Sequence, residues 1–94
     1  MNLYTVIMEF EGTTSVSQTT ASTVVEALAL WADGLRQPEN YGLSSASAHR
    51  LFDCIREEKD VKPVGIRETV NVWCTTVLAG DSLALLNIVK TSRR

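Results

Sequence analysis

The clearest helical pattern in the sequence lies at residues 22–35, which read STVVEALALWADGL. Apolar residues recur there at spacings of three and four, which places their side chains on one face of an α-helix. Thr23 with Glu26 fits a capping box, Ser22 is the other candidate N-cap, and Gly34 is a natural stop. The face that should pack on a sheet consists of Val24, Ala27, Leu28, Trp31, Ala32 and Leu35.

The opposite side of this helix also carries apolar residues, namely Val25, Ala29 and Leu30. A helix that covers one face of a sheet does not need this second strip, so another element must cover it. Residues 45–58 (SASAHRLFDCIREE) predict a second, peripheral helix with a short apolar stripe. We expect this second helix to be the cover for Val25 and Leu30.

Two N-terminal segments predict a β-hairpin: residues 3–10 (LYTVIMEF) and residues 13–20 (TTSVSQTT). Val16 is the only large apolar residue of the second segment, so its position decides the register. A two-residue loop sets Val16 opposite Ile7, and a three-residue loop sets it opposite Met8. We expect the three-residue loop, because it joins Val16 to the apolar face of the first strand.

A second hairpin is predicted near the C-terminus from residues 69–78 (TVNVWCTTVL) and 83–91 (LALLNIVKT). A two-residue loop at positions 80–81 pairs Trp73 with Ile88. Both faces of this hairpin carry large apolar side chains. We therefore expect it to be central in the sheet and covered, at least in part, on both sides.

The order of these elements is β-β-α-α-β-β, without a linker, a repeat or a low-complexity segment. The chain has 94 residues, a formal net charge of -2 and 45% hydrophobic residues, values that are typical of a globular domain. We expect one α+β domain over residues 1–94. It should contain a four-stranded antiparallel sheet with the long helix packed on one face and the second helix at the periphery.

The residues that carry chemistry are few and scattered. His49 is the only histidine, and Asp53 follows it at i+4, which is the spacing of a surface pair on a helix. Cys54 and Cys74 with one histidine cannot complete a tetrahedral zinc site, and no glycine-rich loop opens a helix. We expect two free, buried thiols, with one disulfide as the alternative. The sequence thus predicts no catalytic residue, no metal and no cofactor.

The charge pattern favours neither nucleic acid nor membrane as a partner. The only basic cluster is the C-terminal tail, with Lys90, Arg93 and Arg94, which we interpret as a solvated end. No apolar run approaches the ~20 residues that span a bilayer. The N-terminus lacks the positive region of a signal peptide. We expect a cytoplasmic protein.

Residues 4–31 contain the segments YTVIMEF and SVSQTTASTVVEALALW. Their pattern resembles the opening of HicB-like small proteins, in which a strand, a second strand ending in V-S-Q and a helix follow one another. This resemblance implies a non-catalytic protein that binds another protein, as HicB-like antitoxins bind their toxins. The matching positions are Tyr4, Val6, Glu9, Val16, Ser17, Gln18, Glu26, Ala27 and Leu28.

The absence of recognisable chemistry and the surplus of apolar surface predict a non-catalytic protein-interaction module. We expect a homodimer, because uncovered apolar patches usually mark interfaces and two-fold dimers are the commonest oligomers. The uncharged strand around Val16 adds an edge that is open to pairing. The candidate interaction residues are Val25, Ala29, Leu30, Trp73 and Ile88.

Two other functions remain open from the sequence. One is a small-ligand binder or an enzyme whose site is built by the fold, and a pocket at His49, Glu9 or Arg67 would favour it. The other is a nucleic-acid-associated regulator that uses the sheet and the basic tail.

Overall fold

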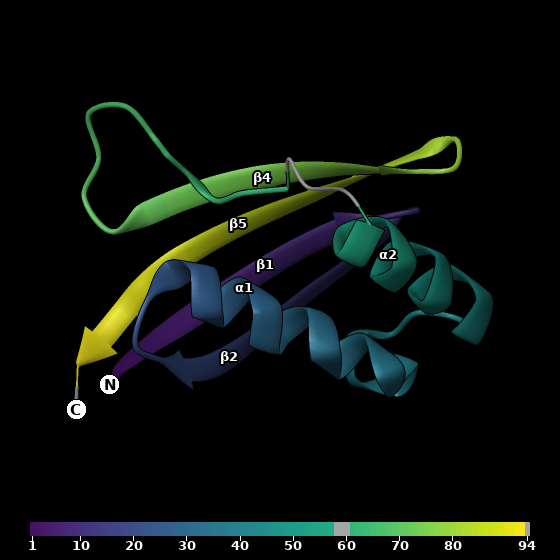
Figure 1. Ribbon diagram of the computed structural model, residues 1–94, viewed down its shortest axis with the longest axis horizontal. Helices are drawn as coiled ribbons and strands as arrows, with labels where there is room; N and C mark the ends of the chain where they lie inside the picture. The colour runs from purple at the N-terminus through teal and green to yellow at the C-terminus, as the bar shows by residue number, and fades with distance from the viewer. Residues whose placement is uncertain (58–60, 94) are drawn as a thin grey trace.

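The computed structural model describes residues 1–57 and 61–93. It contains one antiparallel sheet in the order β2-β1-β5-β4-β3, and both helices lie on the same side of it (Figure 1). The predicted α+β class and antiparallel sheet are confirmed, but the sheet has five strands and not four. The strands are β1 Asn2–Phe10, β2 Thr13–Ala21, β3 Val64–Gly65, β4 Val72–Ala79 and β5 Ser82–Arg93. The helices are α1 Val24–Asp33 and α2 Ser45–Glu57, joined by the 3-10 turns η1 Gly34–Arg36 and η2 Pro38–Tyr41.

The additional strand β3 pairs with the beginning of β4. The chain folds back on itself between the two strands, where the Ile66 N–H donates to the Val72 carbonyl at 3.0 Å. Glu68 and Asn71 both have a φ of 64°, which lets this loop turn sharply. Periodicity did not reveal β3 because the strand has two residues and lies beside a proline. Such a strand is held by backbone hydrogen bonds and not by an apolar pattern.

The first hairpin has a register different from the predicted one. Its loop has two residues, Glu11 and Gly12, and it places Val16 opposite Ile7 instead of Met8. The φ angles of Glu11 and Gly12 are 51° and 77°, the combination of a type I′ turn, whose twist matches that of the strands it joins. The turn decides the register here, and as a result Val16 is 65% exposed.

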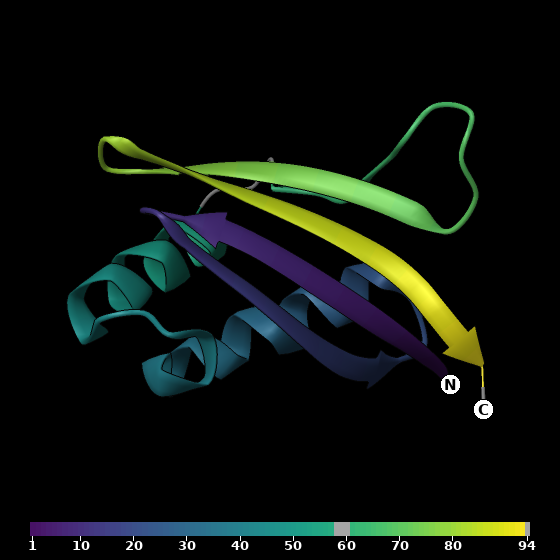
Figure 2. The same cartoon turned by 180° about the vertical axis from the view of Figure 1, so that it is seen from behind.

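The second hairpin has the predicted register, with Trp73 opposite Ile88 around a two-residue turn. It places β5 in the centre of the sheet, between β1 and β4. The expectation that both faces of this hairpin are covered is wrong, because α1 and α2 share one side of the sheet (Figure 2). The other side of the hairpin has no helix over it.

The helix α1 begins as its sequence predicts. The Glu26 N–H donates to the Thr23 hydroxyl at 3.1 Å, and the Ser22 N–H donates to the Glu26 carboxylate at 2.8 Å. The first bond satisfies one of the free amides at the start of the helix, so Thr23 is the N-cap. Trp31, on the predicted inner face, is 2% exposed.

Gly34 ends α1 for a reason that the sequence did not show. Its φ is -64°, so it does not use the left-handed conformation of a typical glycine stop. A Cβ at this position would lie 2.2 Å from the Tyr41 hydroxyl oxygen, which donates to the Trp31 carbonyl at 2.8 Å. The Tyr41 and Trp31 rings are stacked with centroids 4.9 Å apart. The missing side chain of Gly34 therefore leaves space for the Tyr41 ring. Burial of Tyr41 raises the pKa of its phenol.

The helix α2 covers a different region from the predicted one. Its buried residues Ala48 and Leu51 belong to the core that includes Val77 of β4. Val25 and Leu30 on α1 stay 65% and 43% exposed. The expectation that α2 covers them is wrong, because η1 and η2 carry the chain past the end of α1 before α2 begins.

Candidate interaction surface

The side of the sheet that faces away from both helices forms a broad surface, which we call the open face (Figure 2). Side chains alternate between this face and the covered one along every strand. Val6, Met8, Leu86 and Ile88 point to the covered face and are 0% exposed. The open face consists of Leu3, Thr5, Ile7, Glu9, Thr14, Val16, Gln18, Thr20, Val64, Val72, Cys74, Thr76, Leu78, Leu83, Leu85, Asn87, Val89 and Thr91.

Charge is nearly absent from the open face. Among its described residues Glu9 is the only charged one. Val16, Leu78 and Leu83 are 65%, 66% and 60% exposed, so large apolar groups meet solvent there. Depletion of charge with retained apolar area is typical of the centre of a protein interface.

A hydrogen-bonded row of polar side chains crosses three strands of the open face. The Gln18 side-chain amide on β2 donates to the Thr5 hydroxyl on β1 at 3.1 Å. The Thr5 hydroxyl is also hydrogen-bonded to that of Thr91 on β5, and Thr91 donates to the Val89 carbonyl at 3.2 Å. These bonds pair the polar side chains of the row with groups of the sheet itself.

The strand β2 borders the open face and is the outermost strand on its side of the sheet. In a two-residue hairpin the residues that flank the loop are hydrogen-bonded to each other, and the direction alternates from there. Thr14, Val16, Gln18 and Thr20 therefore direct their backbone N–H and C=O groups away from β1. The strand has nine residues and no charge, so it lacks the lysines, prolines and bulges that usually protect an edge.

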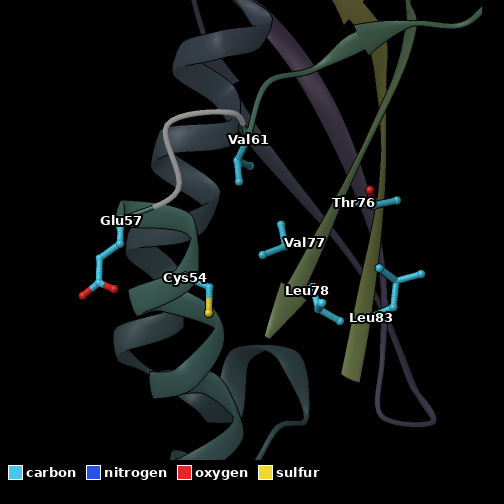
Figure 3. Close-up of a pocket in the computed structure, with 7 residues that line it drawn as sticks. All are labelled: Cys54, Glu57, Val61, Thr76, Val77, Leu78 and Leu83. Carbon is cyan, nitrogen blue, oxygen red and sulfur yellow. The ribbon is translucent and has the colours of Figure 1, made fainter. Parts of the chain in front are cut away.

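The opposite edge of the sheet is only partly open, and a pocket of about 480 Å³ lies beside it (Figure 3). β3 pairs with Trp73 and Cys74 only, so among the described residues the second half of β4 has β5 on one side and no strand on the other. Val77 on β4 and Cys54 on α2 line the pocket with Leu78 and Leu83. The only titratable groups on its described wall are Cys54 and Glu57, so it offers no acid–base pair.

The predicted interaction residues fall into two groups. Val25, Ala29 and Leu30 are exposed on α1, away from the core. Trp73 and Ile88 point to the covered face, where Trp73 is half-buried against Tyr4 at a centroid distance of 6.1 Å. Ile88 is 0% exposed, so the surface of the single chain does not present it. Alternation showed that the hairpin has two apolar faces, but not which of them the helices cover.

The contribution of β1 and β2 to the open face was missed for a related reason. Val16 was assigned inward, which left β2 without an outward apolar residue. Ile7 lies opposite Val16, and both residues belong to the open face. The Glu11-Gly12 dipeptide was the signal that could have identified the register.

Four polar side chains at one end of the sheet form a hydrogen-bonded cluster, which we call the clasp: Glu11, Ser47, Arg50 and Ser82. The Glu11 carboxylate accepts a hydrogen bond from the Ser47 hydroxyl, another from the Ser82 hydroxyl at 3.2 Å, and pairs with Arg50 at 3.0 Å. The Ser47 hydrogen bond, with further contributions from Ser82 and Arg50, lowers the pKa of Glu11. The clasp joins the β1–β2 turn, α2 and the start of β5.

The other titratable groups singled out from the sequence are His49, Asp53, Cys54 and Cys74. Nε2 of His49 lies 3.2 Å from Oδ2 of Asp53 on α2, and the two side chains are 78% and 48% exposed. The predicted surface pair is confirmed. Cys54 and Cys74 are free, as expected, but both are half-buried and not buried. No group of three or more His, Cys, Asp or Glu among the described residues is placed to hold a metal ion.

The predicted basic tail is only partly described. Lys90 is half-buried on β5, and the side chains at positions 93 and 94 lie outside those that the structure describes. Neither described helix has the length and apolarity that crossing a bilayer requires. The resemblance of residues 4–31 to HicB-like proteins stays a prediction. No protein-family model, curated protein or solved structure matches the chain.

Proposed function

We propose that the chain is a non-catalytic protein-interaction module that forms a homodimer through the edge of β2 and the adjoining open face. The observation that carries this proposal is an uncharged, nine-residue edge strand beside a face with a single charged residue among those described. We place the protein in the cytoplasm, since two unpaired thiols suit a reducing compartment.

A two-fold axis at Ser17 would pair two β2 strands antiparallel with all outward backbone groups satisfied. Val16 would then face Gln18 of the partner subunit, and Thr14 would face Thr20 of the partner subunit. The four outward residues lie symmetrically about Ser17, so no group is left over. The two sheets would become one continuous sheet, which removes an exposed edge from each copy.

Two buried hydroxyls on β2 support this register. The Ser15 and Ser17 oxygens are buried and have no hydrogen-bond partner among the described residues. Buried polar groups in native proteins are nearly always paired. Across the proposed axis Ser17 would lie opposite Ser17 of the partner subunit, and Ser15 opposite its Thr19, within reach of a cross-strand hydrogen bond.

Sedimentation equilibrium at micromolar concentration tests the proposal. The chain has a mass of 10.3 kDa, and we expect the wild type to sediment with about twice that mass. Val16→Lys should return it to a monomer, because a lysine on the edge opposes pairing of two like strands. Val25→Lys is the matched control, since Val25 on α1 is also 65% exposed, and it should leave the dimer intact.

Two outcomes would contradict the proposal. A wild type that sediments at 10.3 kDa throughout the micromolar range would exclude the dimer. A dimer that survives Val16→Lys and dissociates with Val25→Lys would move the interface from the sheet to α1.

A toxin-like partner is a narrower version of the same function and rests on the HicB resemblance alone. In that case a second protein would bind either to the β2 edge and open face or to the exposed residues Val25, Ala29 and Leu30 of α1. The open face supports binding in general and does not choose among protein partners.

A further inference from the structure

A second pocket, of about 490 Å³, lies along α2 where the helix faces η1 and η2. Its α2 wall is built from residues at spacings of four, three and four, which places them on one stripe of the helix: Ser45, His49, Phe52 and Arg56. Leu35, Arg36 and Pro38 form the facing wall. The pocket therefore combines apolar surface with two arginines, and its volume is that of a small-molecule site.

The two arginines are gathered on one aromatic ring. The Arg36 guanidinium carbon lies 5.3 Å from the Phe52 ring centroid, and that of Arg56 lies 5.6 Å from it. Both distances are within the range of a cation–π contact, which holds the cations in place. Neither arginine lies within ion-pair distance of a carboxylate among the described residues. Two like charges thus share one ring, in a chain whose net charge is -2.

The pocket wall also carries one described carboxylate, Asp53, whose Oδ2 atom lies 3.2 Å from Nε2 of His49. Its negative charge offsets only one of the two arginine charges, so the described charged side chains of the wall keep a positive balance.

We propose that this pocket binds a small organic phosphate. The phosphate would lie between Arg36 and Arg56, because a guanidinium presents paired N–H donors that match phosphate oxygens. The organic part would pack on Phe52 and Pro38, which supply the apolar wall. Binding would also relieve the repulsion between the two cations.

This site is separate from the proposed dimer interface. The pocket is built by α2, η1 and η2 on the covered side of the sheet, whereas the open face lies on the other side (Figures 1 and 2). A monomer would bind the phosphate as well as a dimer does, so failure of either proposal leaves the other standing.

The test is a titration of the ¹⁵N-labelled full chain with phenyl phosphate at constant ionic strength, followed by amide chemical shifts. We expect saturable shifts that centre on Arg36 and on the α2 residues of the pocket. Arg36→Gln and Arg56→Gln should each weaken binding about tenfold or more, the loss expected for one charge-assisted contact. Arg67→Gln is the control for net charge, since Arg67 is exposed in the β3–β4 loop, and it should bind like the wild type.

Inorganic phosphate and phenol separate the two halves of the site. We expect phenyl phosphate to bind more tightly than inorganic phosphate, and phenol to cause no saturable shift. Equal affinity for phenyl phosphate and inorganic phosphate would overturn the role of the apolar wall. The whole proposal falls if phenyl phosphate gives no saturable shift, if both pocket variants bind like the wild type, or if Arg67→Gln weakens binding as much as they do.

Discussion

The two faces of the sheet are built from the same strands, but only one of them is covered by helices. On the covered face Val6, Met8 and Ile88 are 0% exposed beneath the helices. On the open face the alternate positions leave Val16 and Leu83 65% and 60% exposed. Similar apolar side chains thus pack in the core on one side and stay exposed to solvent on the other. The difference arises from where the helices lie and not from the strand sequences.

The largest loss of stability should follow from a substitution in α1, the helix that carries Trp31 over the covered face. Trp31 is 2% exposed and stacks on Tyr41. Trp31→Ala should lower the free energy of unfolding by about 3–5 kcal/mol, since it removes a large buried ring. Chemical denaturation measures this change directly. An unchanged midpoint would mean that α1 does not depend on Trp31 to hold the covered face.

A smaller but specific loss is expected at the end of α1. Gly34→Ala places a Cβ 2.2 Å from the Tyr41 hydroxyl, so it should destabilise the fold by about 1–3 kcal/mol. Tyr41→Phe removes that hydroxyl and its bond to the Trp31 carbonyl. In the Tyr41→Phe background Gly34→Ala should therefore cost less, and a double-mutant cycle measures the difference. Purely additive effects would show that Gly34 serves another purpose.

Much of the covered face follows from the sequence, because its signals are local. The 3.6-residue period of residues 22–35 identified α1 and its cap at Thr23. The two-residue loop at positions 80–81 identified the register of β4 and β5. The open face could not be identified in the same way, because Trp73 and Val72 alternate equally well in either direction. Only the packing of both helices on one side of the sheet decides which of the two side chains stays uncovered.

The candidate phosphate pocket was even less accessible from the sequence. His49 was noted as one residue whose pocket would favour a ligand, and it does line one. Arg36 and Arg56 are separated by 20 positions, and no motif joins them. Their meeting on Phe52 depends on how η1 packs against α2, which is a tertiary contact.

We expect the contribution of the clasp to stability to depend on pH, because it involves the ionised Glu11 carboxylate. The pKa of Glu11 is lowered in the folded state, chiefly by the Ser47 hydrogen bond. A lowered folded-state pKa means that the ionised carboxylate stabilises the fold above the pKa of the unfolded chain. This stabilisation is lost as the pH falls through the lowered value. Glu11→Gln should thus be less stable than the wild type at neutral pH, and the gap should close in acid.

Thermal unfolding from neutral to acidic pH checks this behaviour. Glu9→Gln is the matched control, since Glu9 lies on the same hairpin outside the clasp and should not reproduce the pH-dependent gap. A gap of constant size at every pH would contradict the role of the Glu11 charge.

The smallest effect is expected on the open face, and it gives the sharpest contrast. Leu83 and Leu86 belong to the same strand, but Leu83 is 60% exposed on the open face and Leu86 is 0% exposed on the covered face. Leu86→Ala should destabilise the monomer by about 2–5 kcal/mol, because it leaves a cavity. Leu83→Ala should change the monomer by no more than about 0.5 kcal/mol, since its side chain is already in water. Denaturation at a protein concentration where the chain is monomeric compares them. A loss at Leu83 that approaches the loss at Leu86 would mean that the open face also stabilises the monomer, and the two faces would no longer have separate roles.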